Sequence, residues 1–553
     1  MRRCFHLLPA VIALIVIAKP LLAAAPEAEG GATARAAHAF EAARKEGPLA
    51  LRGFLVGMPK GADLHVHLSG AIYAESFLRA AGEDGLCIDM KTLAFAKPPS
   101  GGCPRALNQT PVNEMLSHMQ IATNEALYDK LIDAFSMRSF VPYAGWSGHD
   151  QFFSTFDHFS GTNKQHTGEW IDEVASRAAS QNEQYLELMD TPPFGHAAML
   201  AGRMKWNDNP AEFRQRLLDG GLADEVRDAK ELLENAVASR SKIEHCEPGS
   251  AGFAESAGSP SPTSVVSPAS TASTATPSTG PSPACQVQVR FIYQILRGAP
   301  NEQVFAQTLL GFETISKLPN FFVGINFVQP EDGYLSMTEY TTQMHMLDYL
   351  HSVYPNVHIS LHAGELAPGL VTPGGLKFHI RQAVEVGHAE RIGHGVDVMY
   401  EDDAAGLLKE MAAKHVMVEI NLTSNDGILG IKGADHPLPF YRHAGVPVAL
   451  STDDEGVSRI DLTHEYVRAA MEFNLSYADL KQMARTGLEH NFLPGKSLWA
   501  REDTFTASAS ECAGQPLGSE KPAGRCKTFL DANEKAAAQW EQERRFRVFE
   551  AKW

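Results

Sequence analysis

The pattern of hydrophobic and polar positions predicts short strands that alternate with amphipathic helices. Short apolar runs, each ended by glycine or polar side chains, recur along the chain, and helical spacing fills the intervals between them. The expected strands are residues 62–68, 185–190, 286–295, 321–327, 358–362, 391–394, 416–422 and 446–451. Eight strands with helical crossovers predict an α/β fold, the (β/α)8 TIM barrel, with insertions.

Helical patterns also flank the predicted barrel. Ala34 to Val56 is expected to be helical with an interruption at Gly47-Pro48, whereas residues 26–33 before it are expected to be loose. Further helix is expected from Val112 to Phe140 and from Phe529 to Trp553. The expected units are an N-terminal helical extension over 26–57, the barrel over 58–500 and a C-terminal extension over 501–553.

Two segments interrupt the barrel. Residues 81–110 form an excursion that is rich in proline and glycine. The stretch from Pro248 to Ala284 consists almost entirely of Ser, Thr, Pro, Ala and Gly. Such a composition cannot bury a core, so we expect residues 247–284 to be a disordered insertion on the surface of the barrel.

The N-terminus and the cysteines indicate an exported protein. Arg2 and Arg3 precede a mostly apolar stretch and three alanines, which is the pattern of a cleaved signal peptide over residues 1–25. A membrane anchor is the alternative, but Pro9 and the pair Lys19-Pro20 interrupt the apolar run. The remaining six cysteines form three sequence-local couples, which favours the disulfides 87–103, 246–285 and 512–526. We therefore expect a periplasmic or secreted protein without a membrane association after signal cleavage.

The charge balance limits the partners. The chain has 66 acidic and 48 basic residues, with a formal charge of −18. An acidic surface repels phosphate backbones, so nucleic acid is not an expected partner, whereas a small molecule is compatible with this charge. The sequence leaves the oligomeric state open, a homodimer included.

Residues with chemical potential gather where the predicted strands end. Leu64-His65-Val66-His67-Leu68 places two imidazoles on one side of a strand, about 6–7 Å apart. Later strands end at His362 and Glu365, at His394, and at Asp453-Asp454. Functional residues at the carboxyl ends of successive strands are typical of a (β/α)8 barrel.

These residues form a plausible catalytic zinc site. His65, His67, His362 and Asp453 are the ligand types that zinc prefers, and a catalytic zinc lowers the pKa of a bound water from about 16 towards about 7. The further expected roles are proton donation by Glu365, orientation or deprotonation of the water by His394, and substrate contact by Asp454. Each residue alone has an ordinary explanation, such as a salt bridge or a core histidine, but their joint occurrence favours catalysis.

The motifs resemble those of the adenosine deaminase family of metal-dependent amidohydrolases. The similar motifs are His362-Ala363-Gly364-Glu365, Arg391-Ile392-Gly393-His394-Gly395, Thr423-Ser424-Asn425 and Ser451-Thr452-Asp453-Asp454. Met58-Pro59-Lys60-Gly61 before the first histidines resembles the secreted branch, the adenosine deaminase-related growth factors. The resemblance spans about residues 58–500.

The resemblance implies a specific reaction and specific roles. It implies hydrolytic deamination of adenosine or 2′-deoxyadenosine to inosine or 2′-deoxyinosine plus ammonia by a zinc-activated hydroxide, with one Zn²⁺ per chain. Within it, Glu365 would protonate purine N1, Asp454 would accept from N7, and His394 would assist the hydroxide that attacks C6. The implied partner is therefore a small purine nucleoside.

Two positions depart from the family pattern. Ser69 stands where intracellular members carry an Asp that contacts the ribose, and Gln329 stands where a Gly usually lies beside the purine. Both are substrate-binding candidates, so other substrates stay open: adenine, a nucleotide or a modified nucleoside. A growth-factor-like binding protein with reduced catalysis is a further alternative. A two-metal hydrolase is disfavoured because no lysine occurs between Lys317 and Lys377 to bridge two ions.

Overall fold

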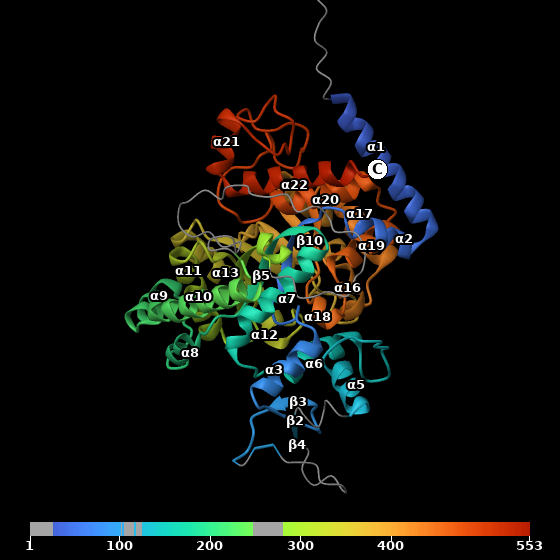
Figure 1. The fold of residues 1–553 in the computed structure, drawn as a ribbon. Coiled ribbons are helices and arrows are strands. Elements are labelled where there is room, and N and C mark those ends of the chain that lie inside the picture. Colours follow the sequence, from blue (N-terminus) through green and yellow to red (C-terminus); the bar gives the residue numbers. More distant parts are fainter. Residues whose placement is uncertain (1–25, 101, 104–114, 118–123, 247–279) are drawn as a thin grey trace, which may run out of the picture.

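Eight parallel strands form one closed sheet in the structure, a computed structural model that describes residues 26–553 except 101, 104–114, 118–123 and 247–279. The order of the strands is β1-β5-β6-β7-β8-β9-β10-β11. Their bounds are β1 Gly61–His67, β5 Glu183–Asp190, β6 Gln288–Leu296, β7 Phe322–Val328, β8 His358–Ala363, β9 Arg391–His394, β10 Met417–Ile420 and β11 Val448–Leu450. Val66 pairs with Asp453, just after β11, and this bridge closes the barrel. The protein is a (β/α)8 barrel, as predicted (Figure 1).

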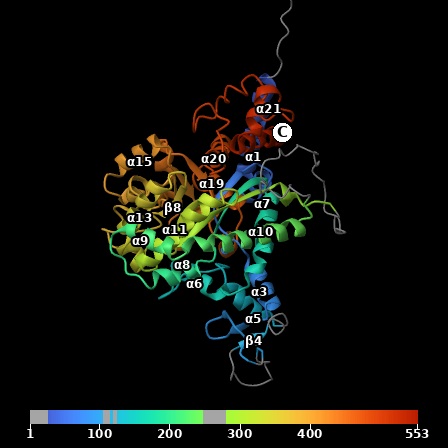
Figure 2. The same cartoon turned by 90° about the vertical axis from the view of Figure 1, so that its left-hand side faces the viewer.

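Helices surround this barrel and bury its outer surface (Figure 2). The described α-helices between residues 74 and 489 are α3 Ala74–Glu83, α5 Glu125–Ala134, α6 Gly148–Phe159, α7 Thr167–Ser180, α8 Gly195–Ala201, α9 Pro210–Asp219, α10 Val226–Ile243, α11 Asn301–Lys317, α12 Tyr334–Thr338, α13 Tyr340–Val353, α14 His379–Glu385, α15 Ala404–Ala413, α16 Leu422–Leu429, α17 Leu438–Ala444, α18 Glu455–Ser458, α19 Leu462–Glu472 and α20 Tyr477–Glu489. Of these, α3, α5 and α6 lie at one end of the molecule (Figure 1). Capping boxes begin α6 and α20, at Ser147 and Ser476, and satisfy backbone N–H groups that the helix leaves free. Strands that are covered by helices on one side and filled on the other read as continuous apolar runs, which explains the pattern in the sequence.

The terminal extensions cover the amino-terminal end of the barrel. They comprise α1 Pro26–Glu46, α2 Pro48–Leu55, α21 Gly524–Asp531 and α22 Glu534–Glu550. The Gln184 amide at the start of β5 donates to the Ala538 carbonyl of α22 over 2.7 Å. The buried Lys60 ammonium donates to the carbonyls of Leu55 and Gln181, which joins the end of α2 to the barrel. This end is therefore closed, and the opposite end is left for the site.

A small antiparallel sheet lies at the far end of the molecule from α1 and α21 (Figures 1 and 2). Its strands are β2 Cys87–Asp89, β3 Ala94–Ala96 and β4 Met115–Ser117, in the order β3-β2-β4. The disulfide 87–103 fixes this excursion, and the disulfides 246–285 and 512–526 are also present. The structure thus contains all three predicted pairs.

Several predictions of local structure were wrong. Residues 26–33 lie within α1, which continues into the alanine-rich stretch after them. The strand β4 stands inside the helix predicted from Val112 to Phe140, of which α5 is the described helical part. The predicted closing helix is divided into α21 and α22 at Ala532-Asn533.

Other predictions are tested only in part. The signal peptide and residues 247–279 of the predicted insertion lie outside the described residues. The last residues of that insertion are ordered, since Pro283–Gln286 form a short 3-10 helix in which Ala284 is buried. Across the part of the chain that the structure describes, no helix combines the length and apolar character needed to span a membrane.

Candidate active site

The four predicted metal-binding residues lie together at the carboxyl ends of the strands. His65 and His67 project from β1, His362 projects from β8, and Asp453 follows β11. Barrel closure places Asp453 beside β1, where its N–H donates to the His65 carbonyl over 2.8 Å. Residues that are far apart in sequence therefore share one buried cluster.

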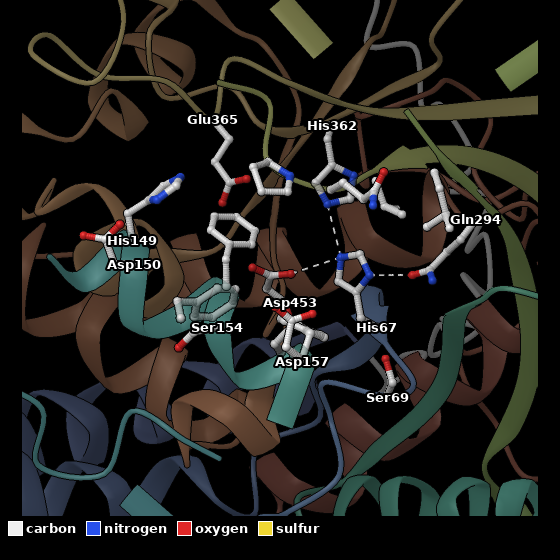
Figure 3. Close-up of a pocket in the computed structure, with 18 of the residues that line it drawn as sticks. His67, Ser69, His149, Asp150, Ser154, Asp157, Gln294, His362, Glu365 and Asp453 are labelled. Carbon is white, nitrogen blue, oxygen red and sulfur yellow. Dashed lines mark hydrogen bonds and ion pairs between the residues drawn. The ribbon is translucent and has the colours of Figure 1, made fainter. Parts of the chain in front are cut away.

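The spacing of the donor atoms fits a single metal ion (Figure 3). The Nε2 atom of His362 is 3.1 Å from the Nε2 atoms of both His65 and His67. The Asp453 Oδ1 atom is 3.5 Å from His65 Nε2 and 3.2 Å from His67 Nε2. Tetrahedral ligands at about 2.0–2.2 Å from a metal lie roughly 3.3–3.6 Å from one another. The cluster therefore has the dimensions of a coordination sphere.

The hydrogen bonds of the three histidine rings, on the side away from the cluster, also indicate a metal site. Each Nδ1 atom faces an oxygen: His65 faces Glu419 (2.6 Å), His67 faces Gln294 (2.5 Å) and His362 faces Asn326 (2.8 Å). An acceptor at Nδ1 holds a proton there, which leaves the Nε2 lone pair of a neutral ring free as a ligand. Three such lone pairs directed at one another repel unless a cation lies between them. The donor set thus fits a metal ion.

The charges of the cluster favour a cation. Burial opposes protonation of His65, but hydrogen bonds to Asp453 and Glu419 raise its pKa to about 10. Burial and the neighbouring histidines hold the pKa of His362 well below its ordinary value. Although burial opposes it, hydrogen bonds from His65 and His67 lower the pKa of Asp453 well below its usual range. Positive charge is therefore stabilised beside Asp453, as a proton on His65 or as a metal ion.

Glu365 and His394 adjoin the cluster. The Oε1 atom of Glu365 lies 3.6 Å from the Nδ1 atom of His394. Burial and the charge of Asp453 raise the pKa of Glu365 well above its ordinary range, which favours the protonated form of this carboxyl. Burial lowers the pKa of His394 to about 3, so its ring is neutral. The Glu365 backbone N–H donates to Glu331 over 2.8 Å, which fixes the loop after β8.

Asp454 lies directly against Gly70. A Cβ atom added to Gly70 would be 1.5 Å from the Asp454 Oδ1 atom, so the carboxyl occupies the place of a side chain. This Oδ1 atom is buried and has no hydrogen-bond partner among the described residues. Burial and the charge of Asp453 raise the pKa of Asp454 well above its ordinary range. Asp454 lines the cavity, where a substrate can supply the missing partner.

The two positions that depart from the family pattern also line the cavity. Gln329 has a φ angle of +88°, and its Oε1 atom accepts from the Gly298 N–H over 2.9 Å. Its side-chain oxygen is thus bonded to the loop after β6. Ser69 lies near His67 at the side of the cavity (Figure 3).

The cavity in front of the donor cluster has a volume of about 590 Å³. Phe152, Phe153 and Phe156 of α6 form an aromatic wall, and Phe152 is buried as well. These side chains therefore contribute both to the core and to the wall of the cavity. Asp150 and Asp157 add carboxylates to the wall, and no Lys or Arg occurs among the described residues that line it.

The residues that hold the catalytic groups in place were not predicted from the sequence. Gln294, Asn326 and Glu419 orient the histidines, and Ser424 donates to Asp453 over 2.6 Å. The available signal was a polar residue inside an apolar strand, as for Glu419 within Met417–Ile420. One assignment was also wrong. The predicted strand 416–422 is too long, because β10 ends at Ile420 and α16 begins at Leu422.

Comparison with known proteins identifies this region. Residues 262–501 match the family model described as adenosine deaminase. This part of the chain is therefore similar to the adenosine deaminase family. An adenosine deaminase of Clostridium perfringens is 35% identical over 135 residues, which are 24% of this chain and 37% of that protein. An adenosine deaminase of Shewanella loihica is 37% identical over 136 residues, which are 24% of this chain and 38% of that protein.

The chain thus spans little more than a third of the length of these adenosine deaminases. A solved structure, the adenine deaminase from Arthrobacter aurescens, has a TM-score of 0.48 at 16% identity and covers 79% of this chain and 94% of that one. The adenosine deaminase family match contains His362, Glu365, His394 and the pair Asp453-Asp454. His65 and His67 lie before it and join the site through the fold. Membership in the growth-factor branch stays a prediction.

Proposed function

We propose that the protein is a zinc-dependent hydrolase that deaminates adenosine or 2′-deoxyadenosine, with inosine or 2′-deoxyinosine and ammonia as products. The observation that carries this proposal is the convergence of a four-donor cluster, the buried Glu365 carboxyl and the unpartnered Oδ1 atom of Asp454 on one cavity. The match of residues 262–501 to the adenosine deaminase family model supports it.

The donor set suits zinc. His65, His67, His362 and Asp453 would hold the ion, because imidazole nitrogen and carboxylate oxygen are ligands that zinc prefers. Bound there, zinc would supply Lewis acidity and favour the deprotonation of water at neutral pH. Ser424 and the three ring partners keep the four donors in place.

Glu365 and Asp454 would act on the purine ring. Addition of an oxygen at C6 requires a proton at N1, and Glu365 holds a proton beside the donor cluster. N7 of adenine is an acceptor of hydrogen bonds, so Asp454 has to donate to it and cannot accept from it. The resemblance gave Asp454 the acceptor role, and we reverse that role. The protonated form that burial favours for Asp454 supports this reversal.

The charge of the cavity favours an uncharged substrate. Its described lining contains Asp150, Asp157 and Glu365 but no ammonium or guanidinium group. A nucleotide phosphate would meet carboxylates without a cationic partner, which costs binding free energy. Nucleosides are therefore favoured over nucleotides. Adenine and modified nucleosides remain the second candidate class.

A substrate panel tests this proposal. Zinc-loaded protein would be assayed with adenosine, 2′-deoxyadenosine, adenine, AMP and N6-methyladenosine by ammonia release. We expect adenosine or 2′-deoxyadenosine to have the highest kcat/KM, with AMP lower by at least about tenfold. A preference for AMP, or the absence of turnover in zinc-loaded protein, would overturn the proposal.

We also propose that the protein acts after export, in the periplasm or outside the cell. Three disulfides within one chain support this location, because such bonds persist in oxidising compartments. Fractionation of cells that express the full chain tests it. Recovery of the protein only in the cytoplasm with free thiols would contradict this location.

A further inference from the structure

A chain of hydrogen bonds that begins outside the cavity determines the tautomer of His394. It starts at α17, where the Leu438 backbone N–H donates to the Nδ1 atom of His436 over 3.1 Å. A backbone N–H can only donate, so this Nδ1 atom carries no proton. The single proton of the neutral His436 ring must therefore be on Nε2. His436 is buried and does not line the cavity.

The second step fixes the orientation of a buried amide. The Nε2–H group of His436 donates to the Oδ1 atom of Asn425, 3.0 Å away. The amide oxygen of Asn425 therefore faces His436, and its Nδ2 atom faces the other way. This assignment follows from the backbone of Leu438 and not from the appearance of the amide, whose two ends have nearly the same size.

The third step determines which ring nitrogen of His394 carries the proton. The Asn425 Nδ2 atom lies 3.0 Å from the Nδ1 atom of His394, and the Asn421 Nδ2 atom lies 3.3 Å from it. Amide N–H groups only donate, so His394 Nδ1 is an acceptor and its proton lies on Nε2. That Nε2 atom is buried and has no partner among the described residues. The His394 ring centroid lies 4.9 Å from that of His65 and 5.1 Å from that of His362.

We propose that His436 is a positioning residue that acts through Asn425 to keep the proton of His394 on Nε2. His394 then meets the attacking oxygen as a hydrogen-bond donor and does not serve as its base. This inference rests on the proposed function, because hydrolytic deamination places that oxygen beside the donor cluster. It also decides between the two roles that the sequence left open for His394, orientation and deprotonation.

The reverse arrangement explains why the relay matters. Without a donor at position 436, the Asn425 amide can rotate and present its oxygen to His394. The proton of His394 would then move to Nδ1, and the Nε2 lone pair would repel the attacking oxygen. A catalytic histidine held in the wrong tautomer can lose up to roughly 10⁴ in kcat.

Substitutions along the relay test the proposal in the full, zinc-loaded chain. His436→Leu removes the donor, and we expect kcat to fall by about 10–100-fold while KM changes little. His436→Gln supplies an amide N–H to Asn425, and we expect it to restore kcat to within about fivefold of the wild type. Asn425→Asp presents only acceptors to His394, so kcat should fall by at least about 10³-fold.

A matched control separates the relay from general packing. His166 is also a buried histidine, but it lies near α7 with Asp84 and Glu169 as neighbours. We expect His166→Leu to keep the wild-type kcat. Zinc content and thermal unfolding would be measured for every variant. If His436→Leu retains the wild-type kcat, or if Gln and Leu at 436 lower it equally in folded protein, the proposal is overturned.

A direct readout does not depend on turnover. In ¹⁵N-histidine-labelled protein, nitrogen shifts should show His394 as the Nε2–H tautomer, and Asn425→Asp should convert it to the Nδ1–H tautomer. A proton on Nδ1 in the wild type would refute the relay even in an active enzyme. Conversely, an Nε2–H tautomer in a protein that deaminates no aminopurine would preserve the relay and refute the proposed function.

Discussion

Substitution of Gly70 or Gly393 by alanine allows the effect of losing substrate contact to be distinguished from the effect of losing the metal. A Cβ atom at position 70 would lie 1.5 Å from Asp454 Oδ1 and 2.3 Å from its Cγ atom. A Cβ atom at position 393 would lie 2.5 Å from His65 Cε1 and 2.8 Å from its Nδ1 atom. Neither glycine has a positive φ, so the backbone itself accepts alanine. The steric conflict is therefore confined to one side chain in each case.

The two substitutions should have different consequences. In Gly70→Ala, the Asp454 carboxyl must retreat by roughly 2 Å to restore ordinary contact, and a displacement of about 1 Å can already cost 10²-fold in rate. We expect kcat/KM to fall by at least about 100-fold with zinc retained. In Gly393→Ala, the added methyl group meets the same edge of the His65 ring whose Nδ1 atom lies 2.6 Å from Glu419, so a retreat of the ring breaks this hydrogen bond. Zinc affinity should then fall by at least about 10–100-fold, and activity should be lost with the metal.

The assay compares zinc content after dialysis, kcat/KM for adenosine and the unfolding temperature. Gly195→Ala is the matched control, because a Cβ atom at position 195 meets no atom within 4 Å. If the kcat/KM of Gly70→Ala stays within about threefold of that of the Gly195→Ala control, Asp454 does not contact the substrate and the prediction is wrong. It also fails if Gly393→Ala retains stoichiometric zinc after chelation.

Four further predictions concern individual residues. Glu365→Gln keeps the shape but loses the proton, so kcat should fall by about 10²–10⁴-fold with zinc retained; full activity would contradict its role as proton donor. His67→Ala should lose zinc and activity together, and full activity after chelation would exclude a catalytic metal. Because the Gln329 side chain is bonded to the Gly298 N–H, Gln329→Gly should change the ranking of aminopurines little; a reversed ranking would show that Gln329 reads the base. Burial raises the pKa of Glu401 from 4.5 to about 7, so the folded protein holds a proton there that the unfolded chain releases. Between about pH 4.5 and 7, the free energy of unfolding of the wild type, measured in urea, should therefore fall relative to that of Glu401→Gln as the pH rises. The slope of this difference is at most about 1.4 kcal/mol per pH unit. If the two stability curves run parallel over this range, the prediction is refuted.

The barrel could be predicted from the sequence because its strands are buried on both faces. Runs such as Phe322–Val328 are apolar except for Asn326, which distinguishes them from the helical spacing between them. The candidate ligands were found for a related reason. Each stands where such a run stops, and the carboxyl ends of barrel strands meet around one cavity.

Other features depend on contacts that a sequence does not show. Glu419 and Asn326 are polar residues within apolar strands, and their partners His65 and His362 come from distant segments. The helix α16 was also not predicted, because its Thr, Ser, Asn and Asp residues are typical of a loop. The relay through His436 requires knowledge of which atom each side chain faces, and spacing in the sequence carries no such information.

The seam between the first and the last strand is also the place where the donor cluster is completed. Val66, which lies between His65 and His67, pairs with Asp453. The same pairing that closes the barrel therefore brings the Asp453 carboxylate to the two histidines. A partly folded chain without this strand pairing has an incomplete donor cluster, so we expect it to bind zinc more weakly than the folded protein. An ion that binds only the closed barrel would strengthen it through mass action, by about 4 kcal/mol when free zinc exceeds its Kd a thousandfold. The stability of the folded protein would therefore follow the zinc supply of its surroundings.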